Sequence, residues 1–447
     1  MKQDRNNILD FHKRVIPPQF IVNAINRLNA AGFEAYLVGG AVRDAYVGRR
    51  ISDWDVTTSA SFDEINSLFS DTKRYSLKYE TVILVDSGHD YEVTTFRRHG
   101  SSAPSLEEDL RHRDFTINAM CYDVSGGKIF DPHNGRMDIR ERTLRAVGNP
   151  EERFMEDPVR LLRAIRFSVE LGFKIEKRTM DKILEMSEGL NSVAGEKIRD
   201  ELMKILISPR PSGGFYMMKK ANLLKHFLPE LEKSYLKRQN SYHKYTIFKH
   251  IMVCVDSVRP DPILRLAALF HDIAKPFVRE KVKGEFKFHG HEEASALMAG
   301  DIMRRLKFSR KSIRKVCHLI SHHMIGYESS WKDSTVRRLI GRVGIENIDD
   351  LMHLRRSDLI AHGIMDDKIE KIGELKSRIE ELNSESIGKG LRGLAIDGKK
   401  VMKILNIGEG PAVGNVLGAL LEKVMEYPEL NNQKDLVEIV ERIIKGH

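Results

Sequence analysis

The spacing of apolar residues changes about a third of the way along the chain. Up to about residue 145, short β-type runs alternate with short helical ones, and five runs predict strands, at residues 35–38, 53–57, 81–85, 91–96 and 128–130. After Pro150, apolar residues recur every three or four positions over residues 158–173, 179–190 and 196–207, which predicts helices. The pattern therefore predicts an α+β fold, in which a small α/β head precedes a long helical body.

Length and composition indicate a multidomain globular protein with a polyanionic partner. The 447 residues exceed one ordinary core, so we expect two or three domains. Apolar residues make up 41% and charged residues 31%, and the net charge of +9 favours nucleic acid as the partner. We find no apolar run of membrane-spanning length and no signal peptide, and Cys121, Cys254 and Cys317 lack metal-binding spacing. These features predict a cytoplasmic protein with no membrane partner and no disulfide framework.

The head contains a candidate phosphate-binding turn. Gly39 and Gly40 end a predicted strand and open a helix, so backbone N–H groups can approach phosphates without a Cβ in the way. Arg43 lies one helical turn further on and could bind the same triphosphate through its guanidinium fork. A Gly-Gly turn alone is structural in many proteins, so this interpretation depends on the residues that follow.

Two carboxylates follow the turn about a dozen residues later. Asp53 and Asp55 lie two apart on the next predicted strand, so both face the same side. Hard oxygen ligands at this spacing suit Mg²⁺, and two such ions could activate a 3′-hydroxyl and hold a leaving pyrophosphate. Glu92, on a later predicted strand, is a candidate third carboxylate. The turn and the carboxylates together favour nucleotidyl transfer.

Five segments resemble the motifs of one enzyme family. Residues 37–44 with 53–55 match its first motif, and residues 113–120 match its second. Residues 130–138, 156–167 and 195–202 are similar to the third, fourth and fifth motifs, in the family's order. The chain thus resembles the class II tRNA nucleotidyltransferase and bacterial poly(A) polymerase family, which implies a polymerase-β-type head with a mixed sheet, and a tRNA substrate. By this resemblance Arg113, Asp114 and Asn118 belong to the nucleotide site, the first two in contact with ribose and phosphate.

Residues of the fourth motif are candidates for choosing the base. Asp157, Arg160, Arg163 and Arg166 recur every three residues on a predicted helix and form one polar stripe. The resemblance implies that Asp157 accepts from cytosine N4 while Arg160 donates to N3 and O2, and such pairings are chemically sound. Arg163 and Arg166 would support the triphosphate or orient this template. A salt-bridged surface helix is the alternative, and adenine also offers an amino donor beside a ring acceptor, so the stripe alone admits ATP.

The connection between the first two motifs is short. Family members that add all of CCA carry a flexible loop after a Thr-Thr-Phe-Arg strand, whereas here residues 94–97 are followed by residues 98–105 and then at once by the acidic segment 106–110. Members with this deletion resemble CC-adding enzymes, whose product receives its A from a separate A-adding enzyme. We therefore expect addition of two C residues from CTP, with complete CCA addition from CTP and ATP as the alternative. His112 departs from the family, which usually has a second arginine before Arg113.

The helical body contains a candidate metal site. His250, the adjacent pair His271 and Asp272, and Asp358 have the order and spread of an HD-type phosphohydrolase domain, and His291, His322 and His323 could add ligands or bind phosphate. Imidazole and carboxylate ligands suit a divalent transition metal or Mg²⁺. A metal-dependent phosphatase or phosphodiesterase activity is therefore a second candidate function, with cyclic phosphate ends of RNA as its candidate substrate.

The resemblance implies a division into four parts. These are a nucleotidyltransferase head (1–145), a helical neck with the base-selecting motif (146–235), an HD-type domain (236–375) and a helical tail that contacts tRNA (376–447). In the tail, Lys399, Lys400 and Lys403 either reach phosphates or form a solvated face. A poly(A) polymerase and a mainly hydrolytic protein remain alternatives, whereas the intact carboxylates disfavour a non-enzymatic tRNA-binding module.

Overall fold

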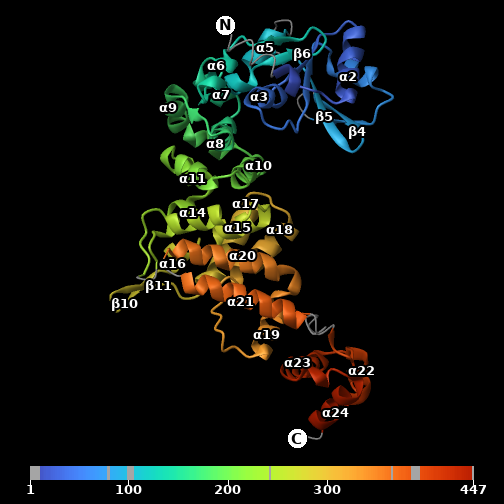
Figure 1. Cartoon of the computed structure of the whole chain (residues 1–447), viewed down its shortest axis with the longest axis vertical. Helices are drawn as coiled ribbons and strands as arrows, with labels where there is room; N and C mark the ends of the chain where they lie inside the picture. The colour runs from blue at the N-terminus through green and yellow to red at the C-terminus, as the bar shows by residue number, and fades with distance from the viewer. Residues whose placement is uncertain are drawn as a thin grey trace. The chain divides into compact units, whose positions relative to one another are not determined.

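The computed structural model describes residues 11–77, 81–97, 105–240, 243–363, 366–383 and 393–444 (Figure 1). The chain divides into two units, Met1–Ile205 with Tyr216–Phe227, and Leu206–Phe215 with Leu228–His447. Each unit is described by itself. The finer division into four parts stays a prediction.

The first unit is built on a seven-stranded sheet with the strand order β3-β4-β5-β2-β1-β6-β7. The strands are β1 (Ala35–Val38), β2 (Asp55–Thr58), β3 (Arg74–Leu77), β4 (Thr81–Asp86), β5 (His89–Thr95), β6 (Cys121–Asp123) and β7 (Lys128–Phe130). All neighbouring strands are antiparallel except β2 and β5, which are parallel. The sheet is therefore mixed, and the predicted α+β class is confirmed.

Helices and two short strands complete this unit (Figure 1). They are α2 (Gln19–Ala30), α3 (Gly40–Val47), α4 (Phe62–Leu68), α5 (Leu106–Arg111), η1 (Thr116–Asn118), α6 (Gly135–Arg140), β8 (Thr143–Leu144), α7 (Pro150–Glu156), α8 (Arg160–Leu171), β9 (Lys174–Ile175), α9 (Lys177–Glu185), η2 (Ser187–Ser192), α10 (Gly195–Leu206), α11 (Pro211–Lys220) and α12 (Leu224–Phe227). The helix α2 shows why they form, because Ile21, Ile25 and Leu28 recur at helical spacing and bury one face in the core of the sheet.

Two predicted elements begin later than the sequence pattern indicates. The strand β2 starts at Asp55, so Asp53 precedes it, and the prediction that both carboxylates lie on one strand is wrong. Asp157 has extended dihedrals between α7 and α8, so only the three arginines of the polar stripe lie on the helix. The residue before a proline is disfavoured in the helical region, and Pro158 follows Asp157 directly.

The second unit is almost entirely helical. Its helices are α13 (Pro229–Glu232), α14 (Ile247–Ser257), α15 (Pro262–Phe270), α16 (Lys275–Val278), α17 (His291–Arg305), α18 (Arg310–Ser321), α19 (Asp333–Val343), α20 (Ile345–His362), α21 (Asp366–Asn383), α22 (Gly398–Leu405), α23 (Pro411–Glu426), η4 (Pro428–Leu430) and α24 (Gln433–Ile444). The helices α14, α15 and α20 pack against one another (Figure 1). The last three helices surround a small core of their own that contains Val401, Leu420 and Leu436.

A β-hairpin interrupts this helical unit and was not predicted. It joins β10 (Glu280–Val282) to β11 (Glu285–Lys287), with Lys283 and Gly284 at positive φ in the turn. Two residues at positive φ are typical of the tight turns that match the twist of a hairpin.

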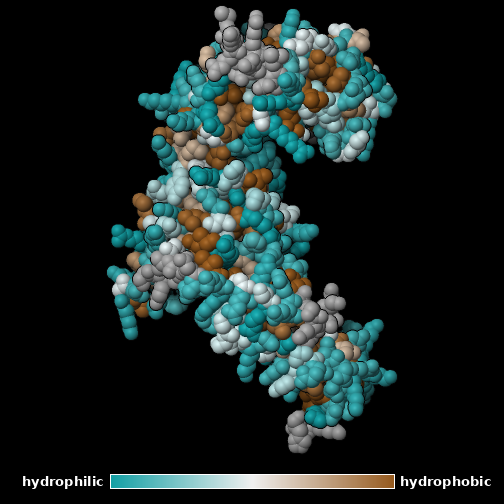
Figure 2. All heavy atoms as spheres, in the orientation of Figure 1, coloured by the Kyte–Doolittle hydropathy of each residue, from teal (hydrophilic) through white to brown (hydrophobic). Residues whose placement is uncertain are grey.

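The surface drawn in Figure 2 is mostly hydrophilic, with hydrophobic residues gathered in small patches. Within the described part of the chain, no helix combines the length and the apolar character needed to cross a membrane.

Candidate active site and candidate metal centre

The strand order of the head brings the candidate phosphate turn beside two carboxylates. Val38, at the end of β1, pairs with Asp55 at the start of β2. Because β2 runs parallel to β5 with Val56 opposite Val93, Asp55 and Glu92 are neighbours on one face of the sheet. A Cβ built on Gly39 would lie 3.6 Å from Asp55 Oδ2. The turn therefore borders the carboxylates.

Three carboxylates crowd this edge of the sheet. Burial and the negative charges of Glu92 and Asp53 raise the pKa of Asp55 to about 7, although Arg113 and Arg43 oppose the shift. Burial, followed by the charge of Asp53, also raises the pKa of Glu92. Carboxylates that repel one another in a partly buried site fit a divalent cation, because the cation would neutralise them and accept their oxygens as ligands. The residues present thus fit Mg²⁺.

Arg43 donates hydrogen bonds to protein groups through all three of its side-chain nitrogens. Its Nε and Nη2 each donate to Asp44 at 2.9 Å, and its Nη1 donates to Asn118 Oδ1 at 2.8 Å. Asn118 donates in turn to Asp114 Oδ1 at 3.0 Å, and Arg163 Nε donates to Asp114 Oδ2 at 2.8 Å. Burial raises the pKa of Asp114, but Arg163 and Asn118 outweigh it and hold that pKa well below its usual range. This network connects α3, η1 and α8.

The network continues from α8 to α10. Glu201 accepts from Arg166 Nε at 2.6 Å and lies 3.8 Å from Arg163 Nη1. Arg166 Nη1 also donates to Glu170 at 2.9 Å, and its guanidinium lies over the Phe167 ring at 3.8 Å. The side chains of Arg166 and Glu201 are only 8% and 6% exposed. These contacts favour an orienting role for Arg163 and Arg166 over direct triphosphate binding. Both roles stay predictions.

A buried carboxylate that the sequence did not single out positions Arg113. Asp109 is fully buried, and its Oδ2 accepts from Arg113 Nη2 at 2.9 Å and from Thr57 Oγ1 at 3.2 Å. Burial raises the pKa of Asp109, but Arg113 and Arg97 outweigh it and lower that pKa. The Nη1 of Arg113 would lie 3.4 Å from a Cβ on Gly39, so Asp109 directs this guanidinium toward the phosphate turn.

The predicted base-selecting pair lies at the junction of α7 and α8. Arg160 donates through Nη1 to Glu156 at 2.7 Å and to the Arg153 carbonyl at 2.9 Å, and through Nη2 to the His112 carbonyl at 2.9 Å. The imidazole of His112 lies between Glu108 and Glu156, at 2.9 and 3.1 Å. Asp157 is partly exposed, and its Oδ1 accepts from the Val159 amide at 3.3 Å. His112 thus contacts Arg160 directly through its backbone carbonyl and indirectly through Glu156, which both side chains contact.

The shortened connection between the first two motifs lies mostly outside the described residues. The strand β5 ends at Thr95 and α5 begins at Leu106, with Ser105 as its N-cap. Residues 98–104 between them are not described.

In the second unit, four residues predicted from the sequence converge. Their ligand atoms, from His250, His271, Asp272 and Asp358, all lie within 4.8 Å of one another, and all four residues are buried. His250 Nε2 lies 3.0 Å from Asp358 Oδ1 and 3.2 Å from Asp272 Oδ2. His250 comes from α14 and Asp358 from α20, while His271 and Asp272 form the turn after α15. The structure therefore assembles the candidate metal site.

Four imidazoles around this cluster share one orientation. The Nδ1 atoms of His250, His271, His291 and His323 each face a backbone carbonyl, which can only accept, so Nδ1 carries a proton. The Nε2 atoms of His291 and His323 make no hydrogen bond, whereas those of His250 and His271 lie 3.2 Å from each other. The acceptors are the carbonyls of Ala361, Ala268, Phe288 and Ile320, at 3.0, 2.8, 2.9 and 2.7 Å respectively. Metal-binding histidines are commonly oriented in this way by the hydrogen bond of their other nitrogen.

Protonation in the cluster matches metal binding. Burial raises the pKa of Asp272, but Lys275, whose Nζ lies 2.6 Å away, and His271 outweigh it, so that pKa is held well below its usual range. Burial lowers the pKa of His323 to about 3. His271 differs, because Asp272 and Asp358 outweigh its burial and raise its pKa to about 10. Ionised carboxylates and neutral imidazoles are the states that bind a cation, and His271 would release a proton on binding.

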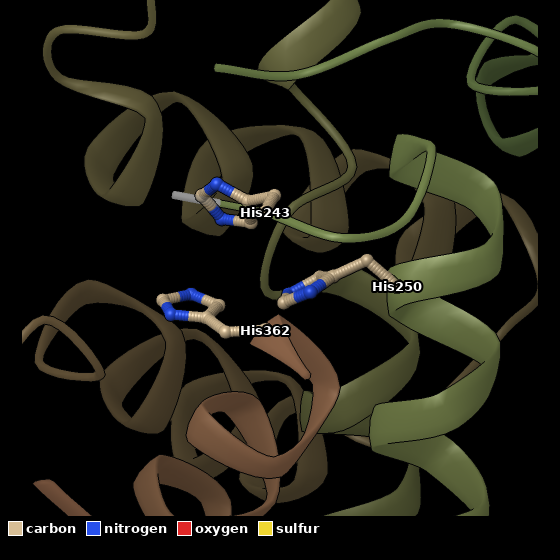
Figure 3. Close-up of side chains that lie close together, drawn as sticks. All are labelled: His243, His250 and His362. Carbon is tan, nitrogen blue, oxygen red and sulfur yellow. The ribbon is translucent and has the colours of Figure 1, made fainter. Parts of the chain in front are cut away.

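Two histidines beside the cluster were not identified from the sequence. His243 and His362 face His250 from the segment before α14 and from the end of α20 (Figure 3). His243 Nε2 lies 3.5 Å from Lys275 Nζ, and both line a cavity of about 320 Å³ together with Asp272. The cavity thus connects the cluster with cationic and imidazole groups.

Of the paired histidines His322 and His323, only the second faces the cluster. His323 forms a group with Asp272 and His291. His322 instead places Nδ1 2.9 Å from the His318 carbonyl and belongs to no such group among the described residues. The two side chains point apart because they are neighbours at the end of α18.

Comparisons with known proteins agree with this arrangement. Three family models match, namely the poly A polymerase head domain at residues 35–145, the probable RNA and SrmB-binding site of polymerase A at 172–235, and the HD domain at 256–365. An A-adding tRNA nucleotidyltransferase of Deinococcus radiodurans is 31% identical over 410 residues, which cover 87% of this chain and 91% of that protein.

Two further comparisons concern CCA-adding enzymes. The enzyme of Ligilactobacillus salivarius is 40% identical over 231 residues, 49% of this chain and 55% of that protein, so the match spans about half the length of this relative. The solved structure of the Bacillus stearothermophilus CCA-adding enzyme in complex with CTP superposes with a TM-score of 0.71 and 26% identity. That superposition covers 96% of this chain and 99% of the other.

Proposed function

Because this chain belongs to the bacterial class II tRNA nucleotidyltransferase family, we propose that it adds nucleotides to the 3′ end of tRNA that lacks its CCA terminus. The observation that carries the proposal is the cluster of Asp53, Asp55 and Glu92 at the edge of the sheet, beside the turn at Gly39. Mg²⁺ bound by Asp53 and Asp55 would lower the pKa of the attacking 3′-hydroxyl and stabilise charge on the leaving pyrophosphate.

The protein groups around this cluster would bind and orient the nucleotide. The amides at Gly39 and Gly40, at the start of α3, would donate to the triphosphate, and Arg113 Nη1 would lie 3.4 Å from a Cβ on Gly39. Asp157 and Arg160 would pair with the cytosine edge, with Arg160 held in place by Glu156 and two backbone carbonyls. The buried network through Asp114 and Arg163 connects α3, η1 and α8 and would fix their positions relative to one another.

The finer proposal is that the enzyme adds two C residues from CTP and stops. It rests on the short connection between β5 and α5, which leaves little chain to reposition the template from cytosine to adenine. A separate A-adding enzyme would then complete the tRNA. Complete CCA addition from CTP and ATP is the second candidate, and the names of the relatives from L. salivarius and B. stearothermophilus favour it.

The test is incorporation on a tRNA transcript without CCA, with CTP alone, ATP alone and both, resolved by product length. A two-residue extension with both nucleotides supports CC addition, and a three-residue product ending in A refutes it. Grafting a longer family loop after Arg98 should then restore A addition. A folded graft that still stops after two residues would show that the short connection is not the cause. Replacing Asp53 and Asp55 by Asn should abolish all incorporation, and retained incorporation would overturn the proposal itself.

The histidine cluster of the second unit supports a further candidate activity, a metal-dependent phosphohydrolase. The supporting observation is the convergence of imidazole Nε2 atoms and carboxylates at a cavity of about 320 Å³ that Lys275 also lines. Cyclic phosphate ends of RNA are the candidate substrate. Hydrolysis of such ends by the full chain with Mn²⁺ or Ni²⁺, and its loss in His271→Ala, would support this activity. An unchanged rate in His271→Ala would remove it.

A further inference from the structure

The carbonyl groups at the end of α5 are held by guanidinium groups from other parts of the head. The helix ends at Arg111, with His112 as its C-cap. The last carbonyls of a helix have no partner within it, and basic side chains often bind them. The Arg111 carbonyl accepts from Arg153 Nη1 at 2.8 Å. The His112 carbonyl accepts from both Arg97 Nη1 and Arg160 Nη2, each at 2.9 Å, so two arginines share one backbone oxygen.

The shared oxygen fixes the orientation of Arg160, the arginine predicted to pair with the base. A carbonyl oxygen has two lone pairs, and Arg97 and Arg160 together occupy both. The other hydrogen bonds of Arg160 within the described residues run from Nη1 to Glu156 and to the Arg153 carbonyl. Its Nε and one N–H of Nη2 are left, and these groups form an edge of the guanidinium that can donate twice to a base. The direction of this edge therefore depends on how Arg160 meets the His112 carbonyl.

A buried carboxylate holds Arg97 in place. The Arg97 amide donates to Asp109 Oδ1 at 3.4 Å, and the guanidinium Nε lies 3.8 Å from the same oxygen. The other oxygen of Asp109 accepts from Arg113 Nη2 at 2.9 Å. The side chain of Asp109 is completely buried, whereas that of Arg97 is 44% exposed. Arg97 thus connects Arg113, through Asp109, with Arg160, through the His112 carbonyl.

Arg97 occupies this place against the charges of its neighbours. Burial and the positive charges of Arg113 and Arg160 lower the pKa of Arg97 to about 10, although Asp109 and Asp114 oppose the shift. Arg97 therefore stays charged at neutral pH and repels the guanidinium with which it shares an acceptor. A partly exposed ion pair contributes little stability, so the contact with Asp109 alone does not explain a cation here. The contact with the His112 carbonyl is the one that reaches the residues predicted to select the base.

We propose that Arg97 is a positioning residue for base selection and acts by sharing the His112 carbonyl with Arg160. This inference rests on the proposed function, because it concerns how the added nucleotide is chosen. With Arg97 in place, the carbonyl has one lone pair for Arg160, and repulsion keeps the two guanidiniums apart. Without Arg97, Arg160 can rotate about this oxygen, and its free edge meets cytosine at a wrong angle. Misplacement of a hydrogen-bonding group by about 1 Å is enough to weaken recognition strongly.

Two other roles for Arg97 lead to different expectations. A guanidinium that bound the triphosphate would affect CTP and ATP alike, because both carry the same triphosphate. A guanidinium that only stabilised the fold through Asp109 would change the amount of active enzyme, again alike for both nucleotides. The ratio of kcat/KM for CTP to kcat/KM for ATP therefore separates positioning of the base-selecting group from both other roles.

The test compares this ratio in the full chain and in Arg97→Met, whose side chain is unbranched and carries neither a charge nor a donor. Single-turnover incorporation on a tRNA transcript without CCA, with the enzyme in excess, quantifies slow addition of A as well as addition of C. We expect the ratio to fall about tenfold in Arg97→Met, because Arg160 is displaced. Arg97→Lys keeps a donor for the His112 carbonyl and should restore most of the ratio.

Arg111→Met is the matched control. Arg111 lies one residue before His112 and is exposed, and within the described part of the chain its side chain makes no hydrogen bond. The same loss of charge at this position should leave the ratio unchanged. Dependence on Arg160 is tested in an Arg160→Ala background, where Arg97→Met should change the ratio no further.

Circular dichroism and urea unfolding show whether Arg97→Met is folded. If it is not, Arg97→Gln, whose side chain ends short of the carbonyl, replaces it with the same expected fall. An unchanged ratio in a folded variant, or a further fall in the Arg160→Ala background, overturns the inference, and a variant that adds no detectable A, like its parent, counts as unchanged. A parent that adds no nucleotide to tRNA refutes the proposed function and this inference with it, whereas an active parent with an unchanged ratio removes only the role of Arg97.

Discussion

Replacement of Asp55 by asparagine should stabilise the metal-free head at alkaline pH. Burial and the charges of Glu92 and Asp53 raise the pKa of this carboxyl from 3.8 to about 7. An acid whose pKa is higher in the folded than in the unfolded state binds more protons when folded. The free energy of unfolding therefore falls as pH rises between the two pKa values. Asparagine keeps the shape of the side chain and removes the charge.

The magnitude follows from the size of the shift. A rise of about 3 pKa units corresponds to about 4 kcal/mol at about 1.4 kcal/mol per unit. Asp55 is partly exposed, so water screens the interaction, and we expect about half of that value, about 2 kcal/mol, at pH 8. The loss of free energy of unfolding caused by Asp55 is absent below about pH 4, where Asp55 is protonated in both the folded and the unfolded chain. This loss grows between about pH 4 and 7 and is constant above about pH 7.

The two tryptophans make the assay specific to one unit. Trp54 lies in the head and Trp331 in the second unit, so Trp331→Phe leaves a single fluorophore that reports unfolding of the head. Urea unfolding in EDTA would be measured at pH 8 and pH 4.5 for this parent and for Asp55→Asn. We expect the variant to be more stable by about 2 kcal/mol at pH 8 and nearly equal at pH 4.5.

The exposed Asp90, on the same strand as Glu92, provides the matched control. Asp90→Asn should change the free energy of unfolding by less than about 1 kcal/mol, because surface substitutions rarely do more. Addition of Mg²⁺ should stabilise the parent and have little effect on Asp55→Asn, since the ligand is lost. If Asp55→Asn is less stable than the parent at pH 8, or if its gain is the same at both pH values, the reasoning about the crowded carboxylates is refuted.

Three further changes test the network, the template and a buried thiol. Glu201→Gln should lower the free energy of unfolding of the head by about 2–3 kcal/mol, because it leaves Arg166 buried beside a neutral group. The side chain of Glu170 is more exposed, so Glu170→Gln should lower it by less than about 1 kcal/mol. Asp157→Ala should reduce the preference for CTP over ATP by about 10–100-fold in kcat/KM, and an unchanged ratio would exclude Asp157 from base selection. Burial raises the pKa of Cys121 to about 12, so this thiol should resist alkylation at pH 8 until urea unfolds the head, as peptide mass analysis would show.

The sequence predicted the position of the elements that carry the candidate active site of the head better than their exact geometry. The runs at residues 35–38 and 128–130 became β1 and β7 with the predicted bounds, because short β-type segments between turn residues are well marked. The start of β2 was two residues too early, since an alternating pattern shows the period of a strand but not where its pairing begins. The role of Asp109 was also missed. It is one of three consecutive acidic residues at the start of α5, and only the folded chain shows that this one is buried against Arg113.

For the second unit, the sequence identified the ligand types but not their grouping. The adjacent His271 and Asp272 are a local signal, whereas His291 and His323 come from other helices, and no spacing rule shows which oxygen of Asp272 each will face. The hairpin β10–β11, whose second strand lines the cavity, was missed because it is short and highly charged. Its Lys283-Gly284 turn was the available signal.

The arginines of the head show why residue type alone does not assign a role. Arg43, Arg163 and Arg166 match motif positions, yet each donates at least two hydrogen bonds to carboxylates or an amide of the protein. A positive charge that is already paired attracts a phosphate weakly, whereas a paired guanidinium fixes the helix that carries it. The network therefore supplies rigidity, whereas the proposed recognition of the base rests on Asp157 and Arg160, the second of which is itself held by Glu156 and two backbone carbonyls. An enzyme that chooses a base without a nucleic-acid template needs this rigidity, because a template that moves by one ångström no longer distinguishes the two hydrogen-bonding patterns.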